Sequence, residues 1–216
     1  MSHLIRQINY YYAIRYIYMT KQRGRPKLYD ANAALEAAGA VFWSKGFSAT
    51  SLDDLANAMA MNRPSIYRAF GDKEAIYRQA LARFSDHMEE GFKRTLLQEP
   101  DIRVGLRKFY REALEIYTSG DSALGCMVMC TAPAAAASHP DVQADLLQVI
   151  QHIDSRMLKC VEKAIVDGQI NESRDAKTLA QLIQAVLHSL AIRARAGESK
   201  TALRKFADAS IATIVA

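Results

Sequence analysis

Apolar residues recur at intervals of three and four positions from about residue 30 to the C-terminus, and this spacing limits the possible folds more than any other feature. Leu35, Ala38 and Phe42 are one example, since residues three and four apart share one face of an α-helix. Glycine and proline, which interrupt helices, number only 10 and 5 among 216 residues. Half of the residues are hydrophobic, which is enough to bury a large core. The sequence therefore predicts an all-α protein.

The helical periods and the residues that interrupt them divide the chain into three parts. We predict a basic N-terminal arm over residues 1–29, a three-helix head over residues 30–77 and a larger helical body over residues 78–216. A helix over residues 72–92 is expected to join the head to the body. Further helices are expected over residues 102–117, 122–137, 140–167, 175–196 and from 200 to the end.

The arm carries all of the chain's excess positive charge. Residues 1–29 hold six basic residues and no acidic one, whereas the rest of the chain holds 22 basic and 23 acidic residues. Such an arm is typical of a segment that binds a polyanion, although solvated basic tails are also common. Arg23 and Arg25 flank Gly24, a pattern similar to the hooks that lie in the minor groove of DNA, so both arginines are predicted DNA contacts.

The first 18 residues differ from the rest in composition. Five of the ten tyrosines fall between residues 3 and 18, and the bias ends at Met19. These residue types are read from AT-rich codons, so our hypothesis is that the segment is upstream DNA translated in frame and that the native protein starts at Met19. The segment lacks the continuous apolar stretch of a secretory signal. A native N-terminus at residue 1 or 2 would instead give it a structural role.

Two short helices are expected to follow one another closely within the head. Thr50 and Asp53 have the spacing of a capping pair at the start of the first, and Asn62 is suited to cap the second. Pro64 falls in the first turn of the second helix, where a missing amide leaves no helical bond unmade. A second helix that begins near Arg63 and carries polar side chains has the layout of a major-groove reader.

The head also contains three ordered runs that resemble the N-terminal motif of the TetR/AcrR family of regulators. They are Thr50-Ser51-Leu52-Asp53-Asp54-Leu55-Ala56, Ser65-Ile66-Tyr67-Arg68-Ala69-Phe70 and Gly71-Asp72-Lys73-Glu74-Ala75-Ile76-Tyr77. The resemblance implies a helix-turn-helix DNA-binding domain followed by a helical ligand-binding and dimerisation domain. The residues that it assigns to DNA are Thr50, Arg63, Pro64, Ser65, Tyr67, Arg68 and Lys73.

The resemblance also implies a role for individual residues. Arg63 and Ser65 are placed for base edges, since arginine suits guanine and a hydroxyl serves several bases. Thr50, Tyr67 and Lys73 are expected to hold phosphates. Each of these residues taken singly also has a plain structural interpretation, as a helix cap, a core aromatic or a solvated surface charge.

The turn between the two short helices departs from the family pattern. Ala60 stands where the family usually has glycine, and its side chain is strained if the backbone there needs a positive φ. The next residue, Met61, is expected to pack under the reading helix.

The last two predicted helices each carry an apolar stripe. In the resembled family the corresponding helices pair with their copies in a second subunit, and two-fold symmetry presents two heads to a palindromic operator. The alternative is that both stripes complete the core of one chain. The residues predicted at the interface are Leu182, Val186, Leu190, Leu203, Phe206 and Ser210.

The centre of the body is expected to hold a small-molecule effector. Aromatic and sulfur side chains suit the walls of an apolar cavity, although their ordinary interpretation is core packing. No cluster of charges identifies the ligand. The predicted pocket residues are Phe109, Tyr110, Tyr117, Met127, Met129, Cys130 and Met157.

Other classes of protein remain as alternatives. Cys126 and Cys130 lie four positions apart with His139 beyond, so a thiol- or metal-responsive regulator is one, although three ligands are fewer than a structural zinc site needs. A helical enzyme is another, but the chain lacks the common catalytic and phosphate-binding motifs, and no metal or cofactor is predicted. A helix-turn-helix protein without an effector is a third.

The sequence as a whole predicts a homodimeric regulator that binds a double-stranded DNA operator. The simplest form is a repressor that an unknown small-molecule effector releases. Three cysteines without a close pair fit a reducing cytoplasm, and no apolar run is long enough to cross a membrane.

Overall fold

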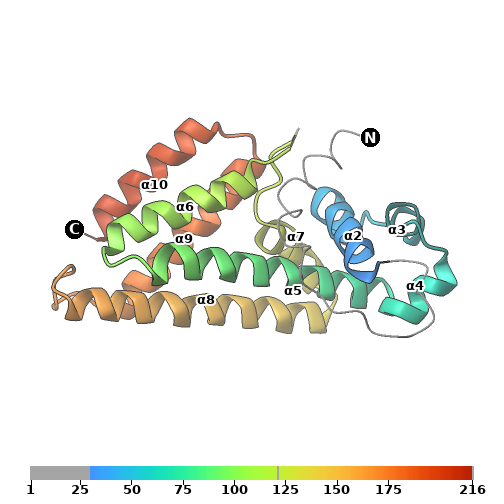
Figure 1. Cartoon of the computed structure of the whole chain (residues 1–216), viewed down its shortest axis with the longest axis horizontal. Helices are drawn as coiled ribbons and strands as arrows, with labels where there is room; N and C mark the ends of the chain where they lie inside the picture. The colour runs from blue at the N-terminus through green and yellow to red at the C-terminus, as the bar shows by residue number, and fades with distance from the viewer. Residues whose placement is uncertain (1–29, 121, 216) are drawn as a thin grey trace.

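Helices make up all regular secondary structure in residues 30–120 and 122–215, the part of the chain that the computed structural model describes (Figure 1). The prediction of an all-α fold is confirmed. The arm, with Arg23, Arg25 and our hypothesis on residues 1–18, lies outside the described residues. The elements are α2 (Ala31–Lys45), α3 (Leu52–Met59), α4 (Arg63–Phe70), α5 (Lys73–Phe92), the π-helical η2 (Lys93–Leu97), α6 (Ile102–Tyr117), α7 (Met127–Ala136), α8 (Pro140–Val166), α9 (Ala176–Arg195) and α10 (Lys200–Ile214).

The helices form a small head at one end of a longer body (Figure 1). The head consists of α2, α3 and α4, and α5 starts in the head and runs beside α8 into the body. α6, α9 and α10 pack against one another in the body. The predicted boundary between residues 77 and 78 falls inside α5, so one continuous helix belongs to both parts. Among the described residues, no helix has the length and apolar character that crossing a membrane requires.

Short-range hydrogen bonds set the ends of the head helices. The carboxylate of Asp30 accepts hydrogen bonds from the backbone N–H groups of Asn32 (2.9 Å) and Ala33 (3.3 Å), and α2 begins there. Asn62 accepts one from the N–H of Ser65 at 2.9 Å and caps α4 as predicted. The short helices of the head therefore need little help from distant residues to start in the right place.

α3 begins one residue later than the predicted capping pair implies. Ser51 accepts a hydrogen bond from the N–H of Asp54 (3.1 Å), and the Asp54 carboxylate accepts one from the N–H of Ser51 (2.9 Å). The hydroxyl of Thr50 is buried and donates to the carbonyl of Gly46 at 2.6 Å. The prediction that Thr50 and Asp53 cap this helix was therefore wrong by one position. Thr50 instead bonds to the loop that precedes α3.

Ala60 adopts the left-handed conformation that a glycine would adopt without strain. Its φ is 52° and its ψ is 40°, and no other non-glycine residue in the described ranges has a positive φ. This conformation turns the chain between α3 and α4, and Met61 is buried directly after it. The predicted strain at this turn is therefore confirmed.

α7 is shorter than predicted and starts at Met127 rather than at residue 122. Gly125 has a φ of 67°, and its N–H donates to the carbonyl of Tyr117 at 3.0 Å. A Cβ at this position would overlap the carbonyl oxygen of Ala191 in α9. The backbone before Met127 is thus held against α9 in a conformation that is not helical.

Candidate nucleic-acid interface

α4 has one buried face and one exposed face. Ile66 and Phe70 are buried in the head, which fixes the orientation of the helix. Tyr67, at the side of this buried face, is 49% exposed. The structure brings most of the predicted reading residues together at this exposed end, where Ser65 is half-buried and the others are exposed: Arg63, Pro64, Ser65, Tyr67 and Arg68.

Arg63 is held by a carboxylate from the neighbouring helix. Its Nε and one terminal nitrogen donate to the same oxygen of Asp53, at 3.0 and 2.6 Å. The hydrogen bonds and the charge of Asp53 raise the pKa of Arg63, so the guanidinium stays charged. Both side chains are solvent-exposed, and pairs of this kind contribute little to stability. The contact therefore orients a cation at the start of the reading helix.

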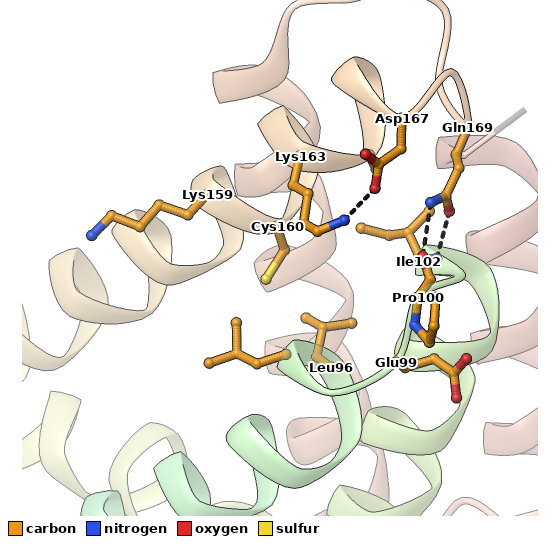
Figure 2. Close-up of a pocket in the computed structure, with 11 residues that line it drawn as sticks. Leu96, Glu99, Pro100, Ile102, Lys159, Cys160, Lys163, Asp167 and Gln169 are labelled. Atoms are coloured by element: carbon orange, nitrogen blue, oxygen red, sulfur yellow. Dashed lines mark hydrogen bonds and ion pairs between the residues drawn. The ribbon is translucent and has the colours of Figure 1, made fainter.

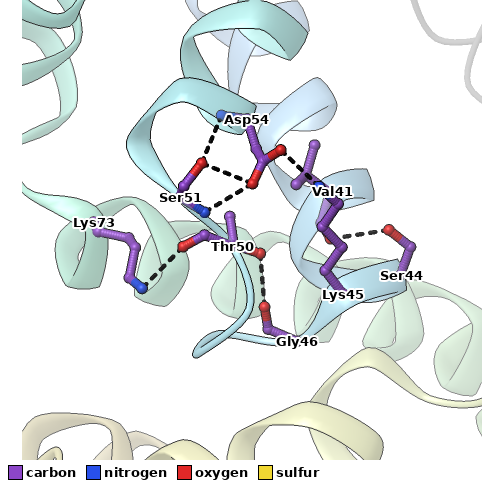
Figure 3. A network of polar contacts seen from close by, with 8 residues as sticks. All are labelled: Val41, Ser44, Lys45, Gly46, Thr50, Ser51, Asp54 and Lys73. Carbon is purple, nitrogen blue, oxygen red and sulfur yellow. Dashed lines mark hydrogen bonds and ion pairs between the residues drawn. The ribbon is translucent and has the colours of Figure 1, made fainter.

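A second ion pair lies at the start of α3 (Figure 3). Lys45 donates to Asp54 at 2.6 Å, and the same carboxylate accepts from Ser51. These hydrogen bonds, that of Lys45 first, hold the pKa of Asp54 far below its usual range. The carboxylate stays ionised, and its charge is matched by a lysine.

Thr50 and Lys73 lie together behind this helix start (Figure 3). The Lys73 ammonium donates to the carbonyl oxygens of Phe47 (3.1 Å) and Thr50 (3.0 Å) and lies 4.3 Å from the centre of the Phe47 ring. Lys73 is thus partly committed to the loop between α2 and α3. The two predicted phosphate contacts therefore lie next to one another. Each already donates hydrogen bonds to backbone carbonyls, Thr50 to that of Gly46 and Lys73 to those of Phe47 and Thr50.

The head is joined to the body by a second route besides α5. Arg195, near the end of α9, donates to the carbonyls of Trp43 (3.1 Å) and Ser44 (3.3 Å) at the end of α2, and to that of Leu124 (3.0 Å). The indole N–H of Trp43 donates to the carbonyl of Gly125 at 3.1 Å. A cation at a helix C-terminus satisfies carbonyls that lack helical partners. We call these five residues the Arg195 junction.

Two further contacts tie α5 itself to the body. The Tyr77 hydroxyl shares a 2.6 Å hydrogen bond with Thr131 in α7, and burial raises the pKa of Tyr77 to about 12. Arg78 donates to Asp145 (2.5 Å) and to Asp141 (2.9 Å) at the start of α8. A movement of the N-terminal half of α5 relative to α7 or α8 would break these bonds.

Sequence reasoning missed the Arg195 junction and the ion pairs of Arg78 with Asp141 and Asp145. Arg78 and Asp145 are 67 positions apart, and Arg195 and Trp43 are 152 apart. Periodicity and capping patterns report only near neighbours, so they carry no signal for such pairs. The isolated Gly125 was the one local hint of a close backbone approach.

The predicted effector residues are buried or half-buried in the body of this structure. Tyr110 is buried and its hydroxyl donates to the carbonyl of Ile183 at 2.8 Å. Phe109, Tyr117, Met127 and Met157 are also buried, and Met129 and Cys130 are partly buried and packed against the core. A cavity of about 230 Å³ lies elsewhere, between η2, the start of α6 and the end of α8. None of the predicted pocket residues lines it, because their side chains fill the space between the helices.

The cysteines of the sensor alternative are held as thiols. Burial raises the pKa of Cys126 to about 11 and also raises that of Cys130. The Cys130 thiol lies 3.7 Å from the carbonyl of Ala191. Within the described ranges, no group of histidine, cysteine and carboxylate side chains is arranged to hold a metal ion. For Cys130 the charge of Arg195 opposes the rise in pKa, but burial outweighs it.

Four of the predicted interface residues keep exposed surface on α9 and α10. Leu182 is 45% exposed, and Val186, Phe206 and Ser210 are half-buried. The guanidinium of Arg193 lies 5.0 Å from the centre of the Phe206 ring and links the two helices.

Two of the predicted interface residues lie on the other side of these helices. Leu190 and Leu203 are fully buried within their own chain, so they are removed from the predicted interface. Ile192, which is 56% exposed, extends the outward face of α9 instead.

Two family profiles match the chain in the order of its parts. The family described as "Bacterial regulatory proteins, tetR family" matches residues 34–80, which covers most of the head and the first turns of α5. The family described as "Tetracyclin repressor-like, C-terminal domain" matches residues 104–210 of the body.

Two proteins of Escherichia coli (strain K12) are similar to this chain. The HTH-type transcriptional repressor ComR is 29% identical over 195 residues, 88% of this chain and 91% of ComR. The HTH-type transcriptional repressor BdcR is 28% identical over 106 residues, 49% of this chain and 54% of BdcR. Among solved structures, a cysteine mutant of the TetR family regulator CifR in complex with a 26-bp operator DNA has a TM-score of 0.79 at 28% identity, and covers 88% of this chain and 98% of its own.

Proposed function

Because the chain belongs to the TetR family of DNA-binding transcriptional regulators, we propose that it is a homodimeric repressor that leaves its operator when a small molecule binds in the body. The observation that carries this proposal is the exposed polar end of α4 on a helix whose other face is buried. Repression is carried over from ComR and BdcR, which bear the name repressor. A protein that binds DNA must be in the compartment that holds the DNA. We therefore also propose that it is located in the cytoplasm.

In the proposed complex α4 enters the major groove. Arg63 and Ser65 face base edges, and the Tyr67 hydroxyl donates to a phosphate. Support comes from the exposure of these side chains and from the operator complex of the similar CifR. Lys73 has one N–H donor beyond the two bound to carbonyls, and this donor is available to a phosphate. Thr50 would first have to exchange its bond to Gly46.

The dimer in this proposal forms through the outward faces of α9 and α10. Leu182 and Ile192 are large apolar side chains with 45% and 56% of their surface exposed, and a second copy would cover them. An interface with two-fold symmetry presents two copies of α4 to two half-sites of one operator.

Release of the operator would require α5 to move relative to the body. The contacts that oppose such movement are the bonds of Tyr77 to Thr131 and of Arg78 to Asp141 and Asp145. An effector that favours a body in which these bonds are broken shifts the heads away from the spacing that fits DNA. Whether the effector weakens or strengthens operator binding depends on whether it binds more tightly to the body with these bonds broken or with them formed.

The experiment is a gel shift at fixed salt, with competitor DNA, on fragments from the protein's own gene neighbourhood. We expect one specific fragment to bind, and Tyr67→Phe and Arg63→Ala each to weaken that binding by roughly ten- to a hundredfold, since a hydrogen bond to a charged partner contributes about 1.5–3 kcal/mol. Arg111→Ala, which changes an exposed arginine of α6, is the matched control and should bind as the wild type does. Equal loss in all three variants, or no specific fragment with a folded dimer present, contradicts the proposal.

A further inference from the structure

The body contains a cavity (Figure 2), which lies beside the end of α8 that is far from the head. It has a volume of about 230 Å³. Its walls come from η2, the loop to α6 and the last turns of α8, so three separate segments border it, and it is open to solvent on one side. Leu96, Leu97, Cys160, Lys163, Asp167 and Gln169 are among the residues that line it.

The polar groups around the cavity are already satisfied by one another. Lys163 is paired with Asp167, and Glu99 is paired with Lys108 at 2.5 Å. The Gln169 side chain donates to the carbonyl of Pro100 and accepts from the N–H of Ile102, both at 2.8 Å. The charges on the walls therefore cancel in pairs, and a bound molecule would meet no unpaired charge from these groups.

The remaining surface is apolar or weakly polar. Leu96, Leu97 and Ala164 contribute aliphatic surface, and Figure 2 shows the Cys160 thiol pointing toward the side on which Leu96 lies. Burial raises the pKa of Cys160 to about 11, so this thiol is uncharged at neutral pH. The Lys159 ammonium points away from the cavity in the same view. Such walls favour a molecule without charge.

The volume sets the size of that molecule. An apolar cavity of about 150 Å³ in another protein binds benzene. A cavity of about 230 Å³ has room for a somewhat larger compact molecule, such as a fused pair of aromatic rings, but it is below the common range for drug-sized ligands, roughly 300–1,000 Å³. An aromatic ring also makes favourable contacts with a sulfur atom such as that of Cys160.

The position of the cavity relates it to the helix that carries the head. η2 follows α5 without a break, and its residues Leu96 and Leu97 form one wall of the cavity. π-helical segments are rare and often occur at functional sites. A molecule that packs against η2 therefore contacts the C-terminal end of the continuous helix formed by α5 and η2. Tyr77 and Arg78 lie near the other end of this helix, close to the head.

We propose that this cavity is the effector site and that it takes a compact, uncharged, mainly apolar molecule about the size of two fused aromatic rings. The effector role rests on the proposed function, whereas binding of such a molecule in the cavity does not. The residues that the sequence analysis assigned to a central pocket do not line this cavity.

The test uses 2-naphthol, which is uncharged at neutral pH, as the probe. Calorimetric titration of the full-length wild type should give one site per chain. Leu97→Trp should weaken binding by at least about tenfold, because Leu97 is 47% exposed at the rim and a larger ring there fills the cavity without entering the core. Cys160→Phe fills it from α8 and should have the same effect.

Val166→Trp is the matched control. Val166 is 86% exposed, lies near the same end of α8 and does not line the cavity, so this variant should bind 2-naphthol as the wild type does. No binding to the wild type, or equal binding to Leu97→Trp and the wild type, overturns the proposal.

A gel shift then tests the effector role. We expect 2-naphthol to release the operator from the wild type and from Val166→Trp but not from Leu97→Trp. Binding that leaves operator affinity unchanged overturns the effector role. If the wild type binds no operator even without the probe, the proposed function has failed, and the titration still decides whether the cavity binds the molecule.

Discussion

The head and the body differ in how far apart along the chain their decisive contacts lie. In the head, Ser51 accepts a hydrogen bond from the N–H of Asp54, and Asn62 accepts one from the N–H of Ser65. Both pairs are three positions apart. In the body, Arg195 reaches Trp43, 152 positions away. The difference teaches that a short stretch of sequence is enough to form the reading helix, whereas its place relative to the body depends on contacts across nearly the whole chain. Variants of the long-range contacts should therefore cost more than variants of the local ones.

Gly125→Ala is expected to have the largest effect. The added Cβ would overlap the Ala191 carbonyl, and the φ of 67° is unfavourable for alanine. Together these effects should lower the free energy of unfolding by about 3 kcal/mol, measured by urea denaturation. Gly168→Ala is the control, since Gly168 has a φ of 71° but nothing within 4 Å of an added Cβ, and should lose only about 1 kcal/mol. Equal losses would mean that the contact with α9 is unimportant.

Arg195→Ala should come next. It removes hydrogen bonds from a charged group to the carbonyls of Trp43, Ser44 and Leu124, and we expect the unfolding free energy to fall by about 2 kcal/mol. Operator affinity in a gel shift should fall as well, because the end of α2 loses its attachment to α9. Lys177→Ala, an exposed change on the same helix, should alter neither quantity. An Arg195 variant with wild-type operator affinity would show that α5 alone positions the head.

The pH dependence of stability should show a smaller effect in the body. Burial lowers the pKa of His188 below its ordinary value of about 6.5, and the charge of Asp154 opposes this shift. The unfolded chain therefore takes up a proton first as the pH falls through 6.5, and the folded state loses stability until its own lower pKa is passed. His188→Gln should flatten this decline in urea unfolding measured above and below pH 6.5. A wild type whose stability does not fall over that interval would contradict the assignment.

Ala60→Gly should give the smallest change and, unlike the others, a gain. Glycine relieves the strain at a φ of 52°, and we expect the unfolding free energy to rise by about 0.5–1 kcal/mol. Ala58→Gly, an exposed change inside α3, should instead lower it by about 1 kcal/mol. A loss in both variants would mean that the turn does not need a left-handed residue.

Much of the fold could be predicted from the sequence because helices leave a periodic trace. The cap at Asn62, the proline in the first turn of α4 and the strained turn at Ala60 were all read locally and all agree with the structure. The start of α3 was misplaced by one residue because Thr50 and Ser51 carry the same hydroxyl, and only the fold shows which one is buried.

The body was less predictable because periodicity does not say which neighbour an apolar stripe will cover. Leu190 and Leu182 belong to the same predicted stripe, yet the first is buried in its own chain and the second is 45% exposed. The cavity was missed for a related reason. Its walls join residues near 97 with residues near 160, and the aromatic residues that suggested a pocket fill the core instead.

The position of Arg195 has a consequence for the geometry of the operator. α9 is a 20-residue helix, about 30 Å long, with Leu182 of the proposed subunit interface in its first half and Arg195 at its end. In the proposed dimer, α9 spans part of the distance between the symmetry axis and the head. Inserting one residue in α9 between these two points would lengthen it by only about 1.5 Å but would rotate its end by about 100°. In the proposed dimer, the length of α9 therefore contributes to the separation and the relative rotation of the two heads.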